Sequence, residues 1–189
     1  MTQRTIPHNA RLIPDTAECV FKGMIFDVYQ WEQEMYDGSF HTYEMLRRPD
    51  TVTVIAVDDH NDIITLTEEQ PGGIRREHYL PGGRVDPGDE SVLDAAKREF
   101  KEETGMEFAD WKLLEVIQPE PKIEWFVHVF VARHLVGTGE PKQDAGERIT
   151  VGSSDYGTVR RARMSDVSAF TRAITLDELL AIVDQTDTA

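Results

Sequence analysis

Three glutamates within five residues form the cluster that is best suited to chemistry. Glu99, Glu102 and Glu103 occupy positions i, i+3 and i+4, and on a helix this spacing places their carboxylates on one face. Like charges this close destabilise an isolated helix unless a cation joins them. Mg²⁺ is typically held by a few carboxylates together with substrate phosphates. The cluster therefore predicts a metal site, and an ordinary solvated helix face is the alternative.

The flanking residues favour a helix that would carry these glutamates. Ser91 is a typical N-cap residue, Asp94 stands at the third helical position, and Gly105 is a natural stop. We therefore expect a helix from about 92 to 104. Its opposite face carries apolar residues that can pack inward, namely Val92, Ala96 and Phe100. One helix would thus be anchored by one face and offer a metal site on the other.

The segment around this helix resembles the Nudix box. That pattern is Gly, five residues, Glu, seven residues, Arg-Glu, an apolar residue, any residue, Glu-Glu, any residue, Gly and an apolar residue. Its second half is matched in full by Arg98, Glu99, Phe100, Glu102, Glu103, Gly105 and Met106. In the first half, six residues separate Gly83 from Glu90, and Arg84 stands where a strict count requires Gly. Either Glu90 or Asp89 takes the acidic position, because the loop before a helix tolerates an insertion.

The resemblance implies a Mg²⁺-dependent hydrolase, with Mn²⁺ as a substitute ion. Three glutamates would bind the metal: Glu99, Glu102 and Glu103. The Gly83 carbonyl would be an extra ligand, and Arg98 would orient a carboxylate such as Glu90 or Glu99. Metal ions that bridge a diphosphate would neutralise it and activate a water. Glu102, Glu103 and Arg98 are thus the catalytic candidates within the box.

A late acidic loop, Asp144-Ala145-Gly146-Glu147, resembles the loop that supplies a further metal ligand or a general base in these enzymes. A carboxylate there could accept a proton from the attacking water. Glu147 is preferred to Asp144, and Glu103 is an alternative base. An ordinary acidic surface loop is the other interpretation.

Arg75 and Arg76 precede the Gly82-Gly83 turn and suit bidentate contacts with phosphate. We expect them, together with Glu69, to contact the substrate. The alternative is that the two arginines pair with surface carboxylates.

The resemblance extends beyond the box to ADP-ribose and nucleoside-diphosphate-sugar pyrophosphatases. It rests on a hairpin from 21 to 46, on the strand candidate 51–57, and on Glu68-Glu69-Gln70. Asp37-Gly38 between two aromatic and β-branched runs is a strong hairpin signal. Pro121 falls sixteen residues after Gly105, as in that group.

In that group a β extension precedes the core domain and contributes to a homodimer and to the substrate site. A hairpin alone is marginal in water and needs a partner surface. We therefore expect residues 1–48 to form an arm and a β-hairpin extension, and residues 49–189 to form the Nudix domain. A hairpin that folds back on its own subunit is the alternative.

The remaining pattern predicts an α+β fold, namely a Nudix-type α/β/α sandwich with a mixed sheet. Expected strands lie at 63–67, 79–80, 111–117, 123–135 and 158–164, with loops at 70–78 and 136–157 and a last helix at 176–183. His128 lies in an apolar run and is expected in the core.

The net charge of the chain limits the classes of binding partner that we expect. The chain has 189 residues, and 35 Asp and Glu against 20 Lys and Arg give a net charge of −15. Such a surface repels nucleic-acid polymers and anionic membranes, so neither is expected as a partner. Cys19 is the only cysteine, and the first twenty residues lack an apolar signal core. A cytoplasmic protein is expected.

The leading hypothesis is hydrolysis of the diphosphate in ADP-ribose or a similar nucleotide sugar, giving nucleoside monophosphate and sugar phosphate. The second is a nucleoside triphosphate pyrophosphohydrolase, although those enzymes usually lack the N-terminal hairpin. The third is a non-catalytic nucleotide-sensing module. Such modules often lose box carboxylates, whereas this chain keeps all three.

Overall fold

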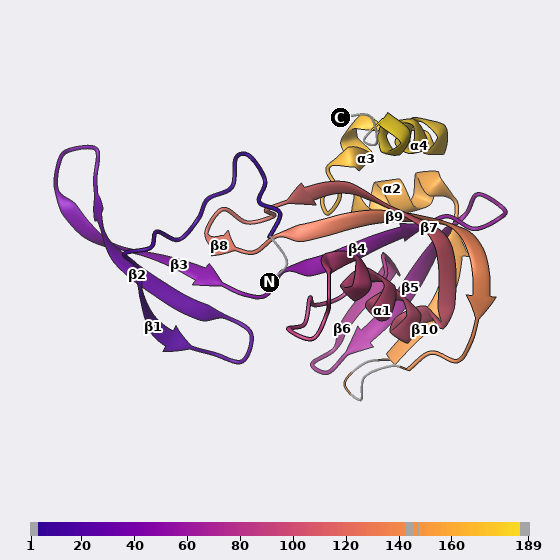
Figure 1. Ribbon diagram of the computed structural model, residues 1–189, viewed down its shortest axis with the longest axis horizontal. Coiled ribbons are helices and arrows are strands. Elements are labelled where there is room, and N and C mark those ends of the chain that lie inside the picture. Colours follow the sequence, from indigo (N-terminus) through magenta and orange to yellow (C-terminus); the bar gives the residue numbers. More distant parts are fainter. Residues whose placement is uncertain (1–3, 143–145, 147, 186–189) are drawn as a thin grey trace.

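The computed structural model describes residues 4–142, 146 and 148–185 (Figure 1). The strands are β1 Glu18–Lys22, β2 Asp27–Glu34, β3 Phe40–Arg47, β4 Thr51–Ala56, β5 Ile63–Gln70, β6 Ile74–Tyr79, β7 Met106–Ile117, β8 Ile123–Glu124, β9 Val127–Thr138 and β10 Arg148–Ser154. The helices are α1 Val92–Thr104, α2 Tyr156–Arg163, α3 Ala169–Arg172 and α4 Leu176–Gln185. In the described part of the chain, no helix is both long and apolar enough to cross a membrane.

Two three-stranded sheets form the body of the molecule. In one, β9 lies between β4, to which it is parallel, and β7, to which it is antiparallel. In the other, β5 lies between β10 and β6, and both pairings are antiparallel. Pairing of β4 and β9 joins Thr51 to Val127, far apart in the sequence, so the mixed arrangement depends on long-range contacts rather than on hairpins alone.

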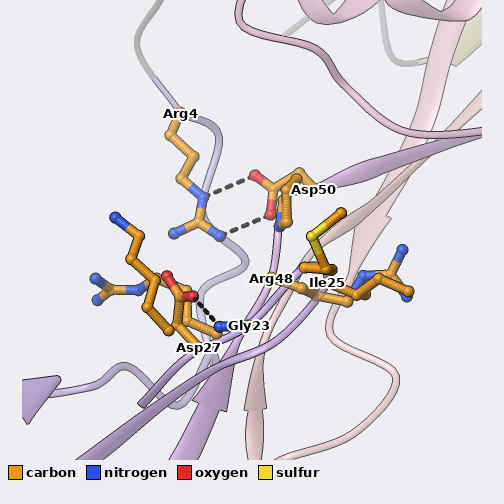
Figure 2. A pocket seen from close by; sticks show the side chains of 10 residues that line it. Arg4, Gly23, Ile25, Asp27, Arg48 and Asp50 are labelled. Atoms are coloured by element: carbon orange, nitrogen blue, oxygen red, sulfur yellow. Dashed lines mark hydrogen bonds and ion pairs between the residues drawn. The ribbon is translucent and has the colours of Figure 1, made fainter. Parts of the chain in front are cut away.

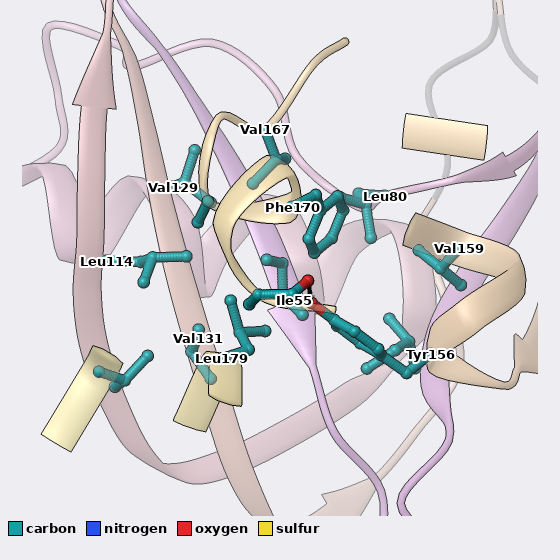
Figure 3. Packing of buried hydrophobic residues seen from close by; sticks show 14 of the residues in the cluster. Ile55, Leu80, Leu114, Val129, Val131, Tyr156, Val159, Val167, Phe170 and Leu179 are labelled. Atoms are coloured by element: carbon teal, nitrogen blue, oxygen red, sulfur yellow. Dashed lines mark hydrogen bonds between the residues drawn. The ribbon is translucent and has the colours of Figure 1, made fainter. Parts of the chain in front are cut away.

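Helices cover both faces of these strands, as predicted (Figure 1). Successive side chains of a strand point to opposite faces. Val54 of β4 therefore packs with Phe100 of α1, while its neighbour Ile55 packs with Phe170 of α3. Figure 3 shows the second of these clusters, in which Val129 and Val131 of β9 face the side chains of α2, α3 and α4. The α/β/α sandwich is thereby confirmed.

A separate sheet, in the order β1-β2-β3-β8, projects away from this body (Figure 1). The hairpin β2–β3 turns at Asp37-Gly38, as predicted, and Gly38 has φ +82° there. The sheet is tied to the core through β8, which pairs in parallel with β3. The single run expected from residue 21 is divided, since β1 and β2 form an additional hairpin around residues 23–26.

The single strand expected at 123–135 is divided into β8 and β9, which belong to different sheets. Three further expectations about local structure were wrong. The predicted loop 70–78 contains β6, because the polar side chains of Arg75 and Arg76 lie opposite glutamates of β5. The predicted loop 136–157 contains β10, which pairs with β5 from Ile63 to Glu69. The predicted strand 158–164 lies in helix α2, where Tyr156 and Val159 are buried at helical spacing.

Candidate active site

Helix α1 has the predicted bounds because both of its ends are capped by local chemistry. The Ser91 Oγ accepts a hydrogen bond of 3.1 Å from the backbone N–H of Asp94. Gly105 has φ +71° and donates its N–H to the Lys101 carbonyl at 2.8 Å. The inward face is buried through Ala95, Ala96 and Phe100. The burial of this face fixes the helix so that its glutamates meet the Gly82-Gly83 turn and the preceding loop.

Arg98 is the centre of the site. Its Nε and Nη2 each donate a hydrogen bond of 2.9 Å to the Asp89 carboxylate, and Nη2 also reaches the Arg84 carbonyl at 2.9 Å. Its Nη1 donates to Glu99 at 2.9 Å and to Glu102 at 3.1 Å. The hydrogen bonds from Arg98 lower the pKa of Asp89. Of the two candidates for the acidic position of the box, Glu90 and Asp89, it is therefore Asp89 that Arg98 binds in a bidentate manner.

Glu99 lies under the glycine turn. Its side chain is 18% exposed, and this burial raises the pKa of Glu99 even though Arg98 opposes the shift. A Cβ atom added to Gly83 would lie 2.3 Å from Glu99 Oε2. Only a glycine at 83 leaves room for the carboxylate in this position.

Glu103 is held on the backbone of the same turn. It is 9% exposed, and its Oε2 accepts a hydrogen bond of 2.8 Å from the Gly82 N–H. The Gly83 carbonyl, a predicted metal ligand, accepts the Val52 N–H at 2.9 Å. A carbonyl oxygen has two lone pairs, so this bond leaves it able to accept a further partner. Glu102 is the most open of the three glutamates, with 44% of its side chain exposed.

The donor chemistry of the site fits a hard divalent cation. Oxygens of Glu99 and Glu102 already meet around one positive group, the Nη1 of Arg98. All of the side-chain donors are carboxylate oxygens, the type that Mg²⁺ and Mn²⁺ accept. Within residues 4–142, 146 and 148–185, however, three or more acidic, histidine or cysteine side chains do not converge into one finished metal cluster.

The three predicted substrate-binding residues lie together on the hairpin β5–β6. Arg75 forms ion pairs with Glu69, its cross-strand partner, and with Glu77 at 3.2 Å. Arg76 pairs with the buried Glu68 at 2.9 Å. Contact of either arginine with a phosphate would therefore exchange one anionic partner for another. Asp144 and Glu147, predicted in the late acidic loop, lie outside the described residues.

Two further residues complete the description of the site region. His128 is 1% exposed in the core, as predicted. Sequence reasoning did not single out Arg48, which lines a pocket at the base of the projecting sheet. No local pattern marks it, because its aromatic contacts, Phe26 and Trp125, come from distant parts of the sequence.

Comparison with known proteins places the chain in a family. The family model described as NUDIX domain matches residues 47–163. The chain is 29% identical to the ADP-ribose pyrophosphatase of Bacillus subtilis (strain 168) over 119 residues, which cover 62% of this chain and 64% of that protein. It is 35% identical to the ADP compounds hydrolase NudE of Escherichia coli (strain K12) over 107 residues, covering 55% and 56%. Both matches thus span less than two thirds of the relative's length.

A solved structure described as an ADP compounds hydrolase has the same fold over nearly the whole chain. It superposes with a TM-score of 0.66 at 19% identity, covering 98% of this chain and 99% of the other. At this identity the likeness concerns the fold alone. The family match over residues 47–163, more than half of the chain, establishes that the chain belongs to the Nudix family.

Proposed function

We propose that this chain hydrolyses the diphosphate bond of a nucleoside diphosphate linked to a sugar, ADP-ribose or a similar compound. The products would be a nucleoside monophosphate and a sugar phosphate. The observation that carries the proposal is the Arg98 cluster, which gathers Asp89, Glu99 and Glu102 beside the turn that holds Glu103. The names of two relatives, an ADP-ribose pyrophosphatase and an ADP compounds hydrolase, support the substrate class.

Glu99, Glu102 and Glu103, with the Gly83 carbonyl, would hold Mg²⁺, and Mn²⁺ would substitute for it. A bound divalent cation would polarise the phosphoryl oxygens and offset the charge that develops on them. Arg98 would orient Glu99 and Glu102, since it contacts both carboxylates and is itself fixed by Asp89. A cation would stabilise the charged form of the partly buried Glu99, because burial raises the pKa of that carboxyl.

The general base would be Glu147, with Glu103 as the alternative within the helix. Glu103 accepts a backbone hydrogen bond from the Gly82 N–H through Oε2, which holds its carboxylate beside the turn. Arg75, Arg76 and Glu69 would contact the substrate. Their position on one hairpin supports this assignment, since a phosphate could take the place of a glutamate as the partner of an arginine.

The arm and the projecting sheet, residues 1–48, would serve a homodimer and the substrate site, and residues 49–189 would form the catalytic domain. Strand β1 is an edge strand with all five residues exposed. The apolar side chains of Phe21, Met24 and Ile25 are 61%, 97% and 57% exposed. Such a surface favours association with a second copy. The cytoplasm is the proposed location, and neither nucleic-acid polymers nor membranes are proposed as partners.

The test is product analysis with purified protein and Mg²⁺. ADP-ribose, other nucleotide sugars, dinucleoside polyphosphates and nucleoside triphosphates would be incubated separately, and the products resolved by chromatography. The double variant Glu102→Gln/Glu103→Gln removes two proposed ligands while conserving side-chain size. Glu107→Gln is the matched control, because Glu107 is an exposed glutamate that pairs with Lys101.

Nucleoside monophosphate from a nucleotide sugar, lost in the double variant and kept in the control, is the expected result. Pyrophosphate released from triphosphates, with nucleotide sugars left intact, would replace the proposal with a triphosphate pyrophosphohydrolase. Tight binding of one nucleotide without turnover would favour a sensing module instead.

A further inference from the structure

A pocket of about 410 Å³ lies where the projecting sheet meets the Nudix domain. Its lining comes from the arm, the β1–β2 hairpin and the end of β3, and it is unusually basic for a chain of net charge −15. The basic residues that line it are Arg4, Lys22, Arg47 and Arg48. The acidic ones are Asp27 and Asp50.

Two of the four cations form ion pairs with carboxylates. Arg4 pairs with Asp50 at 2.6 Å (Figure 2). Arg47 pairs with Glu124 at 3.1 Å. Lys22 lies opposite Asp27 in the β1–β2 ladder, and Asp27 accepts the Gly23 N–H. The two remaining cations are Lys22 and Arg48, and of these Arg48 lies against two aromatic rings.

Arg48 contacts two aromatic rings but forms no ion pair with a carboxylate in the described part of the chain. Its guanidinium carbon lies 4.7 Å from the centre of the Trp125 ring and 5.6 Å from that of Phe26. Its Nε is buried, and the described part of the chain offers it no hydrogen-bond partner. Figure 2 shows the bonded pairs Arg4–Asp50 and Gly23–Asp27, whereas no such link joins Arg48 to the residues drawn. A buried guanidinium donor without an acceptor costs free energy, so Arg48 is held in the pocket wall with its charge uncompensated by the described part of the chain.

The pocket adjoins the loop of the Nudix box. The carbonyl of Asp50, in the pocket wall, accepts the Val85 N–H at 2.9 Å. The next residue, Thr51, forms an antiparallel bridge with Arg84, which follows Gly83 directly. The pocket wall is therefore joined by backbone contacts to the loop that directly follows Gly83.

We propose that this pocket binds a phosphate monoester on a sugar of the substrate, with Arg48 as the anion-binding residue. The planar fork of arginine matches the geometry of phosphate oxygens. The volume exceeds what a phosphate group alone requires and falls in the range of small-molecule sites, so a sugar attached to that phosphate fits as well. Resting on the proposed function, this assigns as preferred substrates those nucleoside diphosphate compounds that carry a further phosphate outside the scissile diphosphate.

Binding is tested first without turnover, so that the outcome does not depend on the proposed activity. Inorganic phosphate is titrated into metal-free protein at low ionic strength, and the arginine Nε–H signals are followed by ¹H–¹⁵N NMR. The Arg48 signal is assigned as the one lost in Arg48→Lys. We expect a saturable shift of that signal, and a dissociation constant about tenfold weaker in Arg48→Gln, as for the loss of charge-assisted hydrogen bonds.

Arg161→Gln is the control for non-specific charge effects, because Arg161 is an exposed arginine outside the pocket. It is expected to bind phosphate as the unsubstituted protein does. Arg48→Lys retains the charge but not the fork, and it is expected to bind with intermediate affinity even if Arg48→Gln folds poorly. Absence of a saturable Arg48 shift, or equal affinity in the unsubstituted protein and Arg48→Gln, overturns the proposal.

A second experiment tests the substrate assignment by comparing kcat/KM for ADP-ribose and for its adenosine 2′-phosphate derivative. The phosphorylated compound should be preferred about tenfold, and Arg48→Gln should remove this preference by lowering kcat/KM for the phosphorylated compound more than for ADP-ribose. Equal kcat/KM values for the two compounds in the unsubstituted protein would overturn the substrate assignment. If neither compound is hydrolysed, the proposed function fails, and the phosphate titration still decides whether the pocket binds an anion.

Discussion

Arg98 holds Asp89 through two parallel hydrogen bonds of 2.9 Å, from Nε to Oδ1 and from Nη2 to Oδ2. This bidentate pair joins the loop before α1 to the outward face of the helix. The same guanidinium contacts Glu99 and Glu102 through Nη1. Asp89 thus holds the Arg98 guanidinium in place, and Arg98 in turn contacts the proposed metal ligands Glu99 and Glu102.

Asp89→Asn should therefore weaken both stability and activity. The Asp89 side chain is only 7% exposed, so loss of this charged partner should cost about 1–3 kcal/mol. Because the folded protein lowers the pKa of Asp89, this contribution is present above the ordinary aspartate pKa and is lost as the pH falls below it. Urea unfolding of both proteins at pH 7 and at about pH 3 measures the difference, which should shrink at the lower pH.

Glu90→Gln is the matched control for Asp89→Asn, since Glu90 is the adjacent and exposed acid. It should change stability and turnover much less. If Glu90→Gln were the more damaging substitution, Glu90 rather than Asp89 would hold the acidic position of the box.

Gly83→Ala and Gly82→Ala should separate activity from stability. A Cβ atom at 83 would lie 2.3 Å from the end of the flexible Glu99 side chain, which can move away, so folding should be little affected while turnover falls about tenfold or more. A Cβ atom at 82 would lie 2.1 Å from the Val52 carbonyl oxygen, with φ at +154°. The Val52 backbone cannot move aside as easily as a side chain can. Gly82→Ala should therefore lower the melting temperature by several degrees.

Thermal unfolding and kcat/KM measured on both variants check this contrast. Equal loss of stability in the two would mean that Glu99 is not free to move. Full turnover in Gly83→Ala would mean that the position of Glu99 under the turn does not matter to the reaction.

The parts of the site that were predicted from sequence are those that local chemistry decides. The bounds of α1 follow from Ser91 and Gly105, which cap the helix with bonds to residues three or four positions away. The structure of α2 could not be read in this way, because Thr158 and Val159 favour strands and the Asp155 cap gains its meaning only once the helix buries Tyr156.

Long-range partners account for the other differences. β6 was read as a loop because Arg75 and Arg76 are polar, and their strand depends on glutamates of β5 that no local pattern connects to them. Arg48 escaped notice for a similar reason. Its two aromatic contacts, Phe26 and Trp125, come from segments on either side of the Nudix box.

Asp50 should make the junction between arm and core sensitive to acid. Burial alone would raise the pKa of Asp50, but hydrogen bonds from Arg4 and from the Phe126 N–H lower it to about 2. The folded-state pKa thus lies below the unfolded value, so the stabilisation is full above about pH 4 and is lost as the pH falls toward 2. The shift corresponds to about 2 kcal/mol.

Asp50→Asn should accordingly lose about 2 kcal/mol of unfolding free energy at pH 7 and be less sensitive than the unsubstituted protein between pH 5 and pH 2. Chemical unfolding at a series of pH values measures both slopes. Asp59→Asn, an exposed aspartate in the turn before β5, is the control and should follow the unsubstituted protein. Parallel slopes for all three proteins would show that the Arg4–Asp50 pair contributes nothing to stability.

The β1–β2 hairpin should be where two copies of the chain associate. Met24 at its tip is 97% exposed and Phe21 on the edge strand is 61% exposed, an arrangement that costs solubility unless a partner surface covers it. Light scattering after size-exclusion chromatography should give twice the chain mass of 21.5 kDa.

The double variant Phe21→Lys/Met24→Lys should elute as a monomer, because two charges per copy would be buried without partners. Leu135→Lys/Val136→Lys, at exposed apolar positions on β9, is the control and should remain dimeric. A monomeric unsubstituted protein, or dissociation by the β9 variant alone, would remove the hairpin from the proposed interface.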